Sequence, residues 1–274
     1  MSPDPHRDDV SGMVDIGANL AHDSFDADRD AVLERAQQAG VAQIVITGSC
    51  ADSNRRVLTL ARQHPAQLFA TAGLHPHHAS DWDRELADQL RELAADPQLV
   101  SLGECGLDYF RDLSPRGDQR RAFIEQLQIA ITTGKPVFLH QRDAHADFHA
   151  ILREHRSALS HVVVHCFTDT QAALEDYLAL DCHIGITGWI CDERRGQHLI
   201  DAVGIIPESR LMIETDAPYL LPRTAPKASH RRNEPGNLIW VARAIAAATQ
   251  RSVEDVALAT AATARAFFGL SAPT

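Results

Sequence analysis

The chain of 274 residues lacks the marks of several protein classes. No apolar run approaches the ~18 residues that cross a bilayer, so neither a membrane span nor a membrane partner is expected. The opening stretch MSPDPHRDDV is polar and acidic, unlike a secretory signal peptide. Residues 1–12 are therefore expected to form a short disordered leader.

Cysteine pairs and positive charge are also scarce. The five cysteines are an odd number and include no C-x-x-C pair, which argues for reduced thiols in a cytoplasmic protein. With 26 basic and 37 acidic side chains the formal net charge is −11, so the molecule as a whole repels nucleic acid. A polyanionic substrate would have to meet a local basic patch.

Short apolar runs rich in β-branched residues recur along the whole chain. They predict strands at 13–19, 43–48, 68–75, 100–106, 136–140, 162–167, 183–188 and 211–217. The intervening segments leave room for one helix each, and several have apolar residues at helical spacing. Eight such units predict parallel strands that close into a (β/α)8 TIM barrel.

An open, doubly wound sheet is the competing architecture. Its usual fingerprint, G-x-G-x-x-G in the first strand-to-helix turn, is missing from the stretch DIGANLAHDSF. No shift in composition suggests a linker, so residues 13–274 are expected to form a single domain.

Polar side chains recur at the ends of the predicted strands, and in a barrel of this kind those ends meet at one rim. They are Asp15 and Asn19, His75, Glu104 and Asp108, His140, His165 and Asp216. Buried acids and imidazoles are costly to desolvate unless they are paired or bound to metal. A divalent metal site accounts for them together, because imidazole nitrogen and carboxylate oxygen are its natural ligands.

Each residue also has an ordinary structural explanation. Glu104 alone would fit a buried acid paired with an arginine, Asp216 a turn former, and His75 a loop residue. If each of these explanations were right, several unrelated polar residues would have to gather by coincidence at one end of one barrel. A single metal site explains them together and is therefore favoured.

A basic cluster lies in the loops that follow strands 7 and 8. It consists of Arg194, Arg195, Arg223, Lys227, Arg231 and Arg232. These loops form the usual phosphate-binding corner of a TIM barrel, and guanidinium groups suit phosphate oxygens. A solvated loop is the plainer alternative. We expect substrate contacts from Asn19, Arg142, Arg194, Arg195, Arg223, Arg231 and Arg232.

Six stretches are recognisable as a set: GECGLD, FLHQRDAH, VHCFT, GITGWICDERRG, LMIETDAPYLLPR and SHRRNEP. They resemble the TatD family of metal-dependent DNases, with the bacterial members closest, and the likeness runs from about residue 13 to residue 269. The resemblance implies a hydrolase of the amidohydrolase-like barrel type. It also implies 3′–5′ exonuclease activity on single-stranded DNA and RNA, in DNA repair or nucleic-acid turnover.

The resemblance also implies a set of site residues. Matching positions give the metal ligands Glu104, His140, His165 and Asp216, with Mg²⁺ as the ion, Mn²⁺ as its substitute and Zn²⁺ as an ion that can occupy the site in vitro. His75 is expected to contact phosphate or water, and Asp216 to serve also as general base. The expected partners are single-stranded 3′ ends, bound by a monomer.

Two departures from the family pattern stand out. Many relatives carry H-x-H on the first strand, where this chain has Gly17 and Asn19, which argues against a tightly held binuclear centre. Gln141 stands where bacterial relatives have cysteine, a change we expect to be tolerated. The rim aromatics Tyr109, Phe110, Trp189 and Tyr219 are candidates for stacking on bases, although core packing would serve them equally well.

Two other function classes stay open on the sequence alone. One is a metal-dependent amidohydrolase or esterase that acts on a small molecule. Such enzymes usually keep H-x-H and often a bridging lysine at a strand tip, and the chain has neither at the expected places. The other is a binding protein without catalysis, against which the complete set of candidate ligands argues.

Overall fold

The computed structural model describes residues 10–226 and 231–272. Within them, eight parallel strands pair in the order β1-β2-β3-β4-β5-β6-β7-β8. The strands are β1 (Met13–Ala18), β2 (Val41–Ile46), β3 (Leu68–Ala72), β4 (Leu99–Asp108), β5 (Val137–Arg142), β6 (Val162–Val164), β7 (His183–Ile186) and β8 (Leu211–Ile213). The predicted eight-stranded TIM barrel is confirmed.

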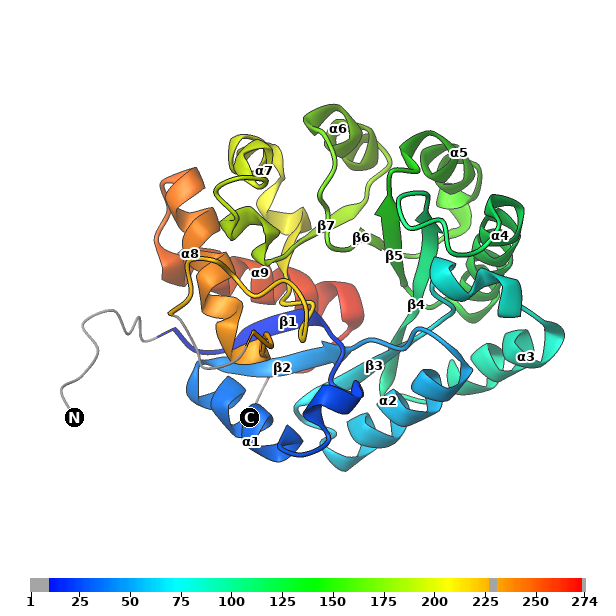
Figure 1. The fold of residues 1–274 in the computed structure, drawn as a ribbon, viewed down its shortest axis with the longest axis horizontal. Helices are drawn as coiled ribbons and strands as arrows, with labels where there is room; N and C mark the ends of the chain where they lie inside the picture. Colours follow the sequence, from blue (N-terminus) through cyan, green and yellow to red (C-terminus); the bar gives the residue numbers. More distant parts are fainter. Residues whose placement is uncertain (1–9, 227–230, 273–274) are drawn as a thin grey trace.

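Helices follow the strands around the outside of the barrel (Figure 1). They are α1 (Arg29–Gln38), α2 (Ala51–Gln63), α3 (Arg84–Leu93), α4 (Arg116–Thr133), α5 (His145–His155), α6 (Gln171–Ala179), α7 (Gln197–Ala202), α8 (Leu238–Thr249) and α9 (Val253–Phe268). Local sequence sets several of their ends. Ser252 caps α9 by accepting the backbone N–H of Asp255, and Gly134 ends α4 with a φ of 70°.

Short 3₁₀ turns shape the connections between these elements. They lie at Asp23–Phe25, Pro76–Asp81, Arg156–Ala158, Gly188–Cys191, Val203–Ile205, Glu208–Arg210 and Pro235–Asn237. Two of them directly follow strand ends and carry residues of the site described below. Among the described helices, none is both long enough and apolar enough to cross a bilayer.

The apolar core has two parts. The larger cluster fills the layer between the strands and the surrounding helices. A second cluster fills the interior of the barrel at the N-terminal ends of the strands. There Val14, Phe138 and Met212 of the strands meet Ala264 and Phe267 of α9. Helix α9 thus closes the N-terminal end of the barrel, and the polar groups collect at the opposite end. Val10 is buried as well, so the core already includes part of the stretch 1–12; residues 1–9 lie outside the described part.

The barrel closes between β8 and β1 just beyond the end of β8. A bridge joins Ala18 to Ala217, and the N–H of Asp216 donates to the carbonyl of Gly17 at 2.8 Å. The buried carboxyl of Asp15 adds a side-chain clasp, since it accepts the backbone N–H of Thr215 at 2.9 Å and the hydroxyl of the same residue at 2.5 Å. Closure at this seam fixes the segment that carries Asp216.

Candidate metal centre

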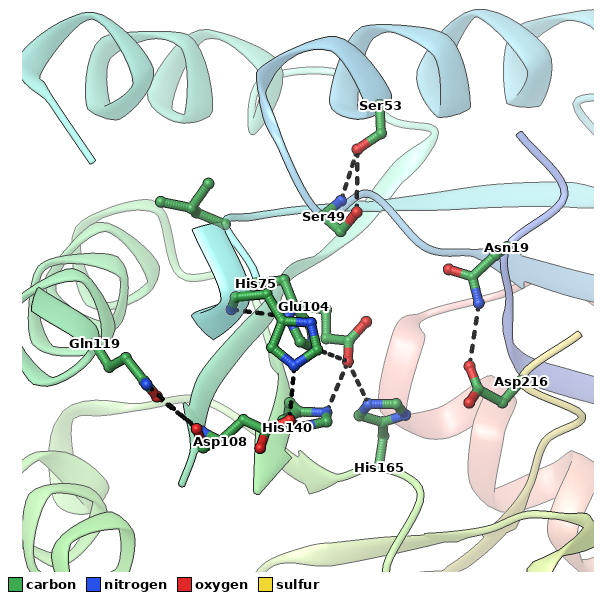
Figure 2. A network of polar contacts seen from close by, with 12 residues as sticks. Asn19, Ser49, Ser53, His75, Glu104, Asp108, Gln119, His140, His165 and Asp216 are labelled. Atoms are coloured by element: carbon green, nitrogen blue, oxygen red, sulfur yellow. Dashed lines mark hydrogen bonds and ion pairs between the residues drawn. The ribbon is translucent and has the colours of Figure 1, made fainter. Parts of the chain in front are cut away.

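The carboxyl of Glu104, on β4, is the centre of the site. Its Oε1 lies 2.9 Å from Nδ1 of His140 on β5, 2.8 Å from Nε2 of His165 just after β6, and 3.3 Å from Nε2 of His75 beyond β3. Figure 2 shows the three imidazoles around this carboxyl, with Asp216 beyond His165 and turned toward Asn19. Residues from four separate strand ends therefore meet at one point, as the sequence predicts.

These groups lie in a cavity of about 770 Å³ at the C-terminal mouth of the barrel. Asn19 and Asp216 line it too, and Nδ2 of Asn19 donates to Oδ1 of Asp216 at 3.1 Å. Seven of the eight polar residues singled out at the predicted strand ends thus face one space. The exception is Asp15, whose carboxyl lies in the seam between β8 and β1.

Two further carboxylates stand behind the imidazoles. Oδ2 of Asp108 lies 3.4 Å from Nε2 of His140 and 2.8 Å from Nε2 of His77. Oε2 of Glu214 lies 3.3 Å from Nδ1 of His165. Each of the two imidazoles nearest Glu104 therefore has a carboxylate on its far nitrogen. This arrangement fixes ring orientation and tautomer in metal sites.

Glu214 reaches His165 because glycine makes room for it. A Cβ at Gly17 would collide with Oε2 of Glu214, and a Cβ at Gly185 would collide with Oε1. Glu214 is fully buried, and its Oε1 also accepts the backbone N–H of Cys166. The absence of histidine at position 17 is therefore tied to this carboxylate, which fills the space beside β1.

His75 is oriented differently from the other two imidazoles. Its Nδ1 accepts the backbone N–H of His77 at 3.1 Å, so the proton of the neutral ring is on Nε2. Burial lowers the pKa of His75 to about 4, which keeps the ring neutral at physiological pH. His75 consequently presents an N–H donor to Glu104 and the cavity, whereas a metal ligand would need a lone pair there.

Burial and neighbouring charges shift the pKa values of the cluster in opposite directions. Burial alone would raise the pKa of Glu104, but the charge of His165 and the hydrogen bonds from the imidazoles hold it well below its usual value. Burial would likewise lower the pKa of His165, yet the carboxylates of Glu104 and Glu214 raise it well above normal. Asp216 has fewer donors, and burial raises its pKa to about 7. A carboxyl that titrates near neutral pH can take and release a proton.

The residues present fit a divalent metal. Ligand atoms of His75, Glu104 and His140 all lie within 4.8 Å of one another. Because His75 offers a donor, His165 is the better third member, with its Nε2 beside the same carboxylate oxygen. Glu104, His140 and His165 supply the mixed nitrogen and oxygen set that divalent ions prefer.

The structure divides the predicted substrate contacts into two groups. Asn19, Arg142 and Arg195 line the cavity. Among the described residues, its lining does not include four of the predicted contacts: Arg194, Arg223, Arg231 and Arg232. Lys227 lies outside the described residues.

Two of the arginines outside the cavity lining form ion pairs with acids from other segments. Arg223 donates from Nε and from a terminal nitrogen to Glu193, at 2.8 Å each. Arg232 is only 18% exposed and is held by Asp28 and Glu234 at 2.7 and 2.8 Å. Both arginines are ion-paired and neither lines the cavity, so their contact with substrate stays a prediction.

Sequence reasoning missed Glu214 and His77. Both stand two residues from a residue that was singled out, Asp216 in ETDAP and His75 in GLHPHH. The available signal was their place in the same short motifs and not strand alternation, since His77 lies in a 3₁₀ turn and Asp216 has a φ of 53°. Tyr109 was proposed for the rim, but its hydroxyl donates to Asp147 at 2.7 Å.

Comparison with known proteins agrees with this geometry. The family model described as TatD related DNase matches residues 14–269. The chain is 49% identical to a protein of Erwinia amylovora named 3′-5′ ssDNA/RNA exonuclease TatD, over 94% of this chain and 100% of that one. It is 48% identical to the protein of the same name from Erwinia tasmaniensis, with the same coverage.

Solved structures give the same answer. A TatD homologue from Escherichia coli superposes with a TM-score of 0.88 at 28% identity, covering 95% of this chain and 99% of its own. A TatD family hydrolase from Entamoeba histolytica shares the fold, with a TM-score of 0.87 at 24% identity and coverage of 96% and 99%. The match to the family model spans nearly the whole chain, and the chain therefore belongs to the family of TatD-related DNases.

Proposed function

We propose that this protein, a metal-dependent hydrolase of the nuclease kind by its family, is a Mg²⁺-dependent 3′–5′ exonuclease. Its substrate would be single-stranded DNA and RNA, and its role DNA repair or nucleic-acid turnover. The observation that carries the proposal is the meeting of Glu104, His140 and His165 at the floor of a cavity with Arg142 and Arg195 on its wall. The names of the Erwinia relatives support the choice of substrate.

Glu104, His140 and His165 would hold the metal. When bound there, a divalent ion polarises a phosphoryl oxygen and lowers the pKa of a water molecule. Two imidazoles and a carboxylate leave room for waters and substrate oxygens on a divalent ion. The choice of Mg²⁺, with Mn²⁺ as a substitute, rests on the family resemblance, because imidazole nitrogens are also usual ligands of Zn²⁺.

The other residues of the chain have distinct proposed tasks. Oδ1 of Asp216 is held by Asn19, which leaves Oδ2 to take a proton from the attacking water. Burial raises the pKa of this carboxyl in the metal-free protein, which strengthens it as a base. His75 would donate its Nε2–H to a phosphate oxygen or to water. Arg142 and Arg195 would bind the backbone of the terminal nucleotides.

A direct assay tests the proposal. Single-stranded DNA labelled at its 5′ end is incubated with the protein and Mg²⁺, or with a chelator, and the products are resolved by length. We expect stepwise shortening from the 3′ end with Mg²⁺ and none with chelator. Glu104→Gln should abolish it, and Glu254→Gln, an exposed acid on α9, should not. If neither Mg²⁺ nor Mn²⁺ gives shortening, the proposal is wrong, and a small-molecule substrate would have to be sought.

The protein would act as a monomer on single-stranded 3′ ends. The five cysteines are all free thiols, which supports a reducing, cytoplasmic location.

A further inference from the structure

One wall of the cavity carries arginines and aromatic rings in alternation. The order is Arg111, Phe110, Arg142, Trp189, Arg195, and we call this set the stacking row. Successive guanidinium carbons and ring centres lie 5.9, 4.3, 5.3 and 4.4 Å apart. All five residues line the same cavity as Glu104. The row is thus a continuous strip of flat, positively charged and aromatic groups at the mouth of the barrel.

The barrel itself holds the row in place. Phe110 and Arg111 directly follow β4, Arg142 is the last residue of β5, and Trp189 lies in the turn after β7. Oδ1 of Asp108 accepts the backbone N–H of Arg111 at 2.7 Å, and Asp192 holds the guanidinium of Arg195 at 2.8 and 3.0 Å. Asp108 and Asp192 thus orient two members of the row, Arg111 through its backbone and Arg195 through its guanidinium, which limits the entropy that these residues lose on binding.

The middle of the row lies close to the candidate metal ligands. His140 and Arg142 are two residues apart on β5, so their side chains share a face and their Cα atoms are about 7 Å apart. Phe110 leaves 55% of its surface exposed at this mouth, although large apolar side chains usually find cover. A flat apolar ligand that arrives beside the metal site would supply that cover.

We propose that the stacking row is a binding subsite for the unpaired bases that precede the scissile phosphodiester. This inference rests on the proposed nuclease function. Bases stack on aromatic rings and guanidinium planes whatever their sequence, and the same arginines can donate to the backbone phosphates. A paired base has both faces covered and its edge occupied, so the row selects single strands without selecting a sequence.

Binding without catalysis tests the proposal. We would measure the fluorescence anisotropy of a 5′-labelled single-stranded oligonucleotide in EDTA, because the row needs no metal. A series of oligonucleotides would each carry one abasic residue, at successive positions from the 3′ end. We expect the abasic residue to weaken binding by roughly 5- to 100-fold at one or two positions near the 3′ end, and little elsewhere.

Protein variants locate the effect. Trp189→Ala should weaken binding of the intact strand and remove the penalty of the abasic residue, and Trp189→Phe should restore most of both. Trp240→Ala is the matched control, because Trp240 on α8 also packs on an arginine, at 4.5 Å, yet is not part of the described cavity lining. If Trp189→Ala fails to fold, the abasic series on the wild-type protein still decides.

Several results would overturn the stacking row. They are an intact strand that does not bind in EDTA, an abasic residue without effect at every position, and a penalty that Trp189→Ala leaves unchanged. Failure of the nuclease function looks different. If binding depends on the bases but the strand is not shortened in Mg²⁺, the nuclease function is wrong and the stacking row still holds. If the strand is shortened but binding does not depend on the bases at any position, the stacking row is wrong and the nuclease function still holds.

Discussion

Oε2 of Glu214 lies 3.3 Å from Nδ1 of His165, and the opposite nitrogen of that ring faces Glu104 at 2.8 Å. Glu214 therefore acts through His165 as a positioning residue. By accepting from Nδ1 it leaves Nε2 for a metal. Asp108 does the converse for His140, where Nδ1 faces Glu104.

The first prediction concerns this carboxylate. Glu214→Gln replaces one of two oxygens by an amide group, so it cannot serve both His165 and the N–H of Cys166. We expect metal affinity to fall by about 10- to 100-fold. Titration calorimetry with Mn²⁺ measures it directly, and Glu254→Gln is the control. An unchanged affinity would show that Glu214 has no part in positioning the ligand.

The barrel could be predicted from sequence because each strand is a local apolar run, and eight runs suffice to count the units. The strand ends could not. The predicted strands 162–167 and 211–217 run past Val164 and Ile213, where the regular strands β6 and β8 end. Just beyond them, Cys166 and Asp216 adopt positive φ values of 46° and 53°. The chain turns there to present His165 and Asp216, and composition alone does not record such a turn.

The candidate metal ligands were predictable because each lies near the end of a predicted strand. The arginines were not, since their charge partners are distant in sequence. Arg232 meets Asp28 across 204 positions, and Glu193 is 30 positions before Arg223. A local count of positive charge says nothing about such pairs, so it does not show which arginines have an acidic partner.

The second prediction separates His75 from the metal ligands. Its Nδ1 accepts from the N–H of His77, which places the proton on Nε2. His75→Ala should therefore lower kcat by about 10- to 100-fold while metal affinity changes less than about threefold. Steady-state kinetics and Mn²⁺ titration give the two numbers. A large loss of affinity would make His75 a ligand.

The third prediction links metal binding to pH. Burial raises the pKa of Asp216 to about 7, so at pH 6 the metal-free protein holds a proton there, and at pH 8 it does not. If Asp216 joins the ligands, binding at pH 6 releases that proton, and affinity rises with pH through about 7.

Calorimetry in buffers of different ionisation enthalpy counts the protons released. Wild-type protein should release more at pH 6 than at pH 8, and Asp216→Asn should lose most of that difference. Equal release by the two proteins at pH 6 would remove Asp216 from the metal site.

The fourth prediction concerns Arg232. It pairs with Asp28 and Glu234, and its guanidinium lies 4.7 Å from the ring centre of Phe25. Arg232→Ala should lower the free energy of unfolding by about 1–2 kcal/mol, since the network is only partly buried. KM for single-stranded DNA should change less than twofold. Urea unfolding and steady-state kinetics check both quantities. Arg195→Ala, at the cavity wall, should instead raise KM and leave the free energy of unfolding nearly unchanged.

The last prediction concerns the seam between β1 and β8. Burial raises the pKa of Asp15 from 3.8 to about 8, although Thr215 and Gly17 donate hydrogen bonds to it. The folded protein thus favours the protonated acid. Its contribution to stability is fully present below pH 4 and is lost as pH rises through about 8. Asp15→Asn keeps an uncharged side chain of the same shape and has nothing to titrate.

The stability difference between the two proteins should therefore depend on pH. Urea unfolding in EDTA at pH 6, 7, 8 and 8.5 gives the free energy of each. Asp15→Asn should gain on the wild type as pH rises, because only the wild type must bury a charge at the upper end. A difference that stays constant from pH 6 to 8.5 would mean that Asp15 is already ionised in the fold. In that case the three donors from Thr215 and Gly17 stabilise the carboxylate more than burial opposes it.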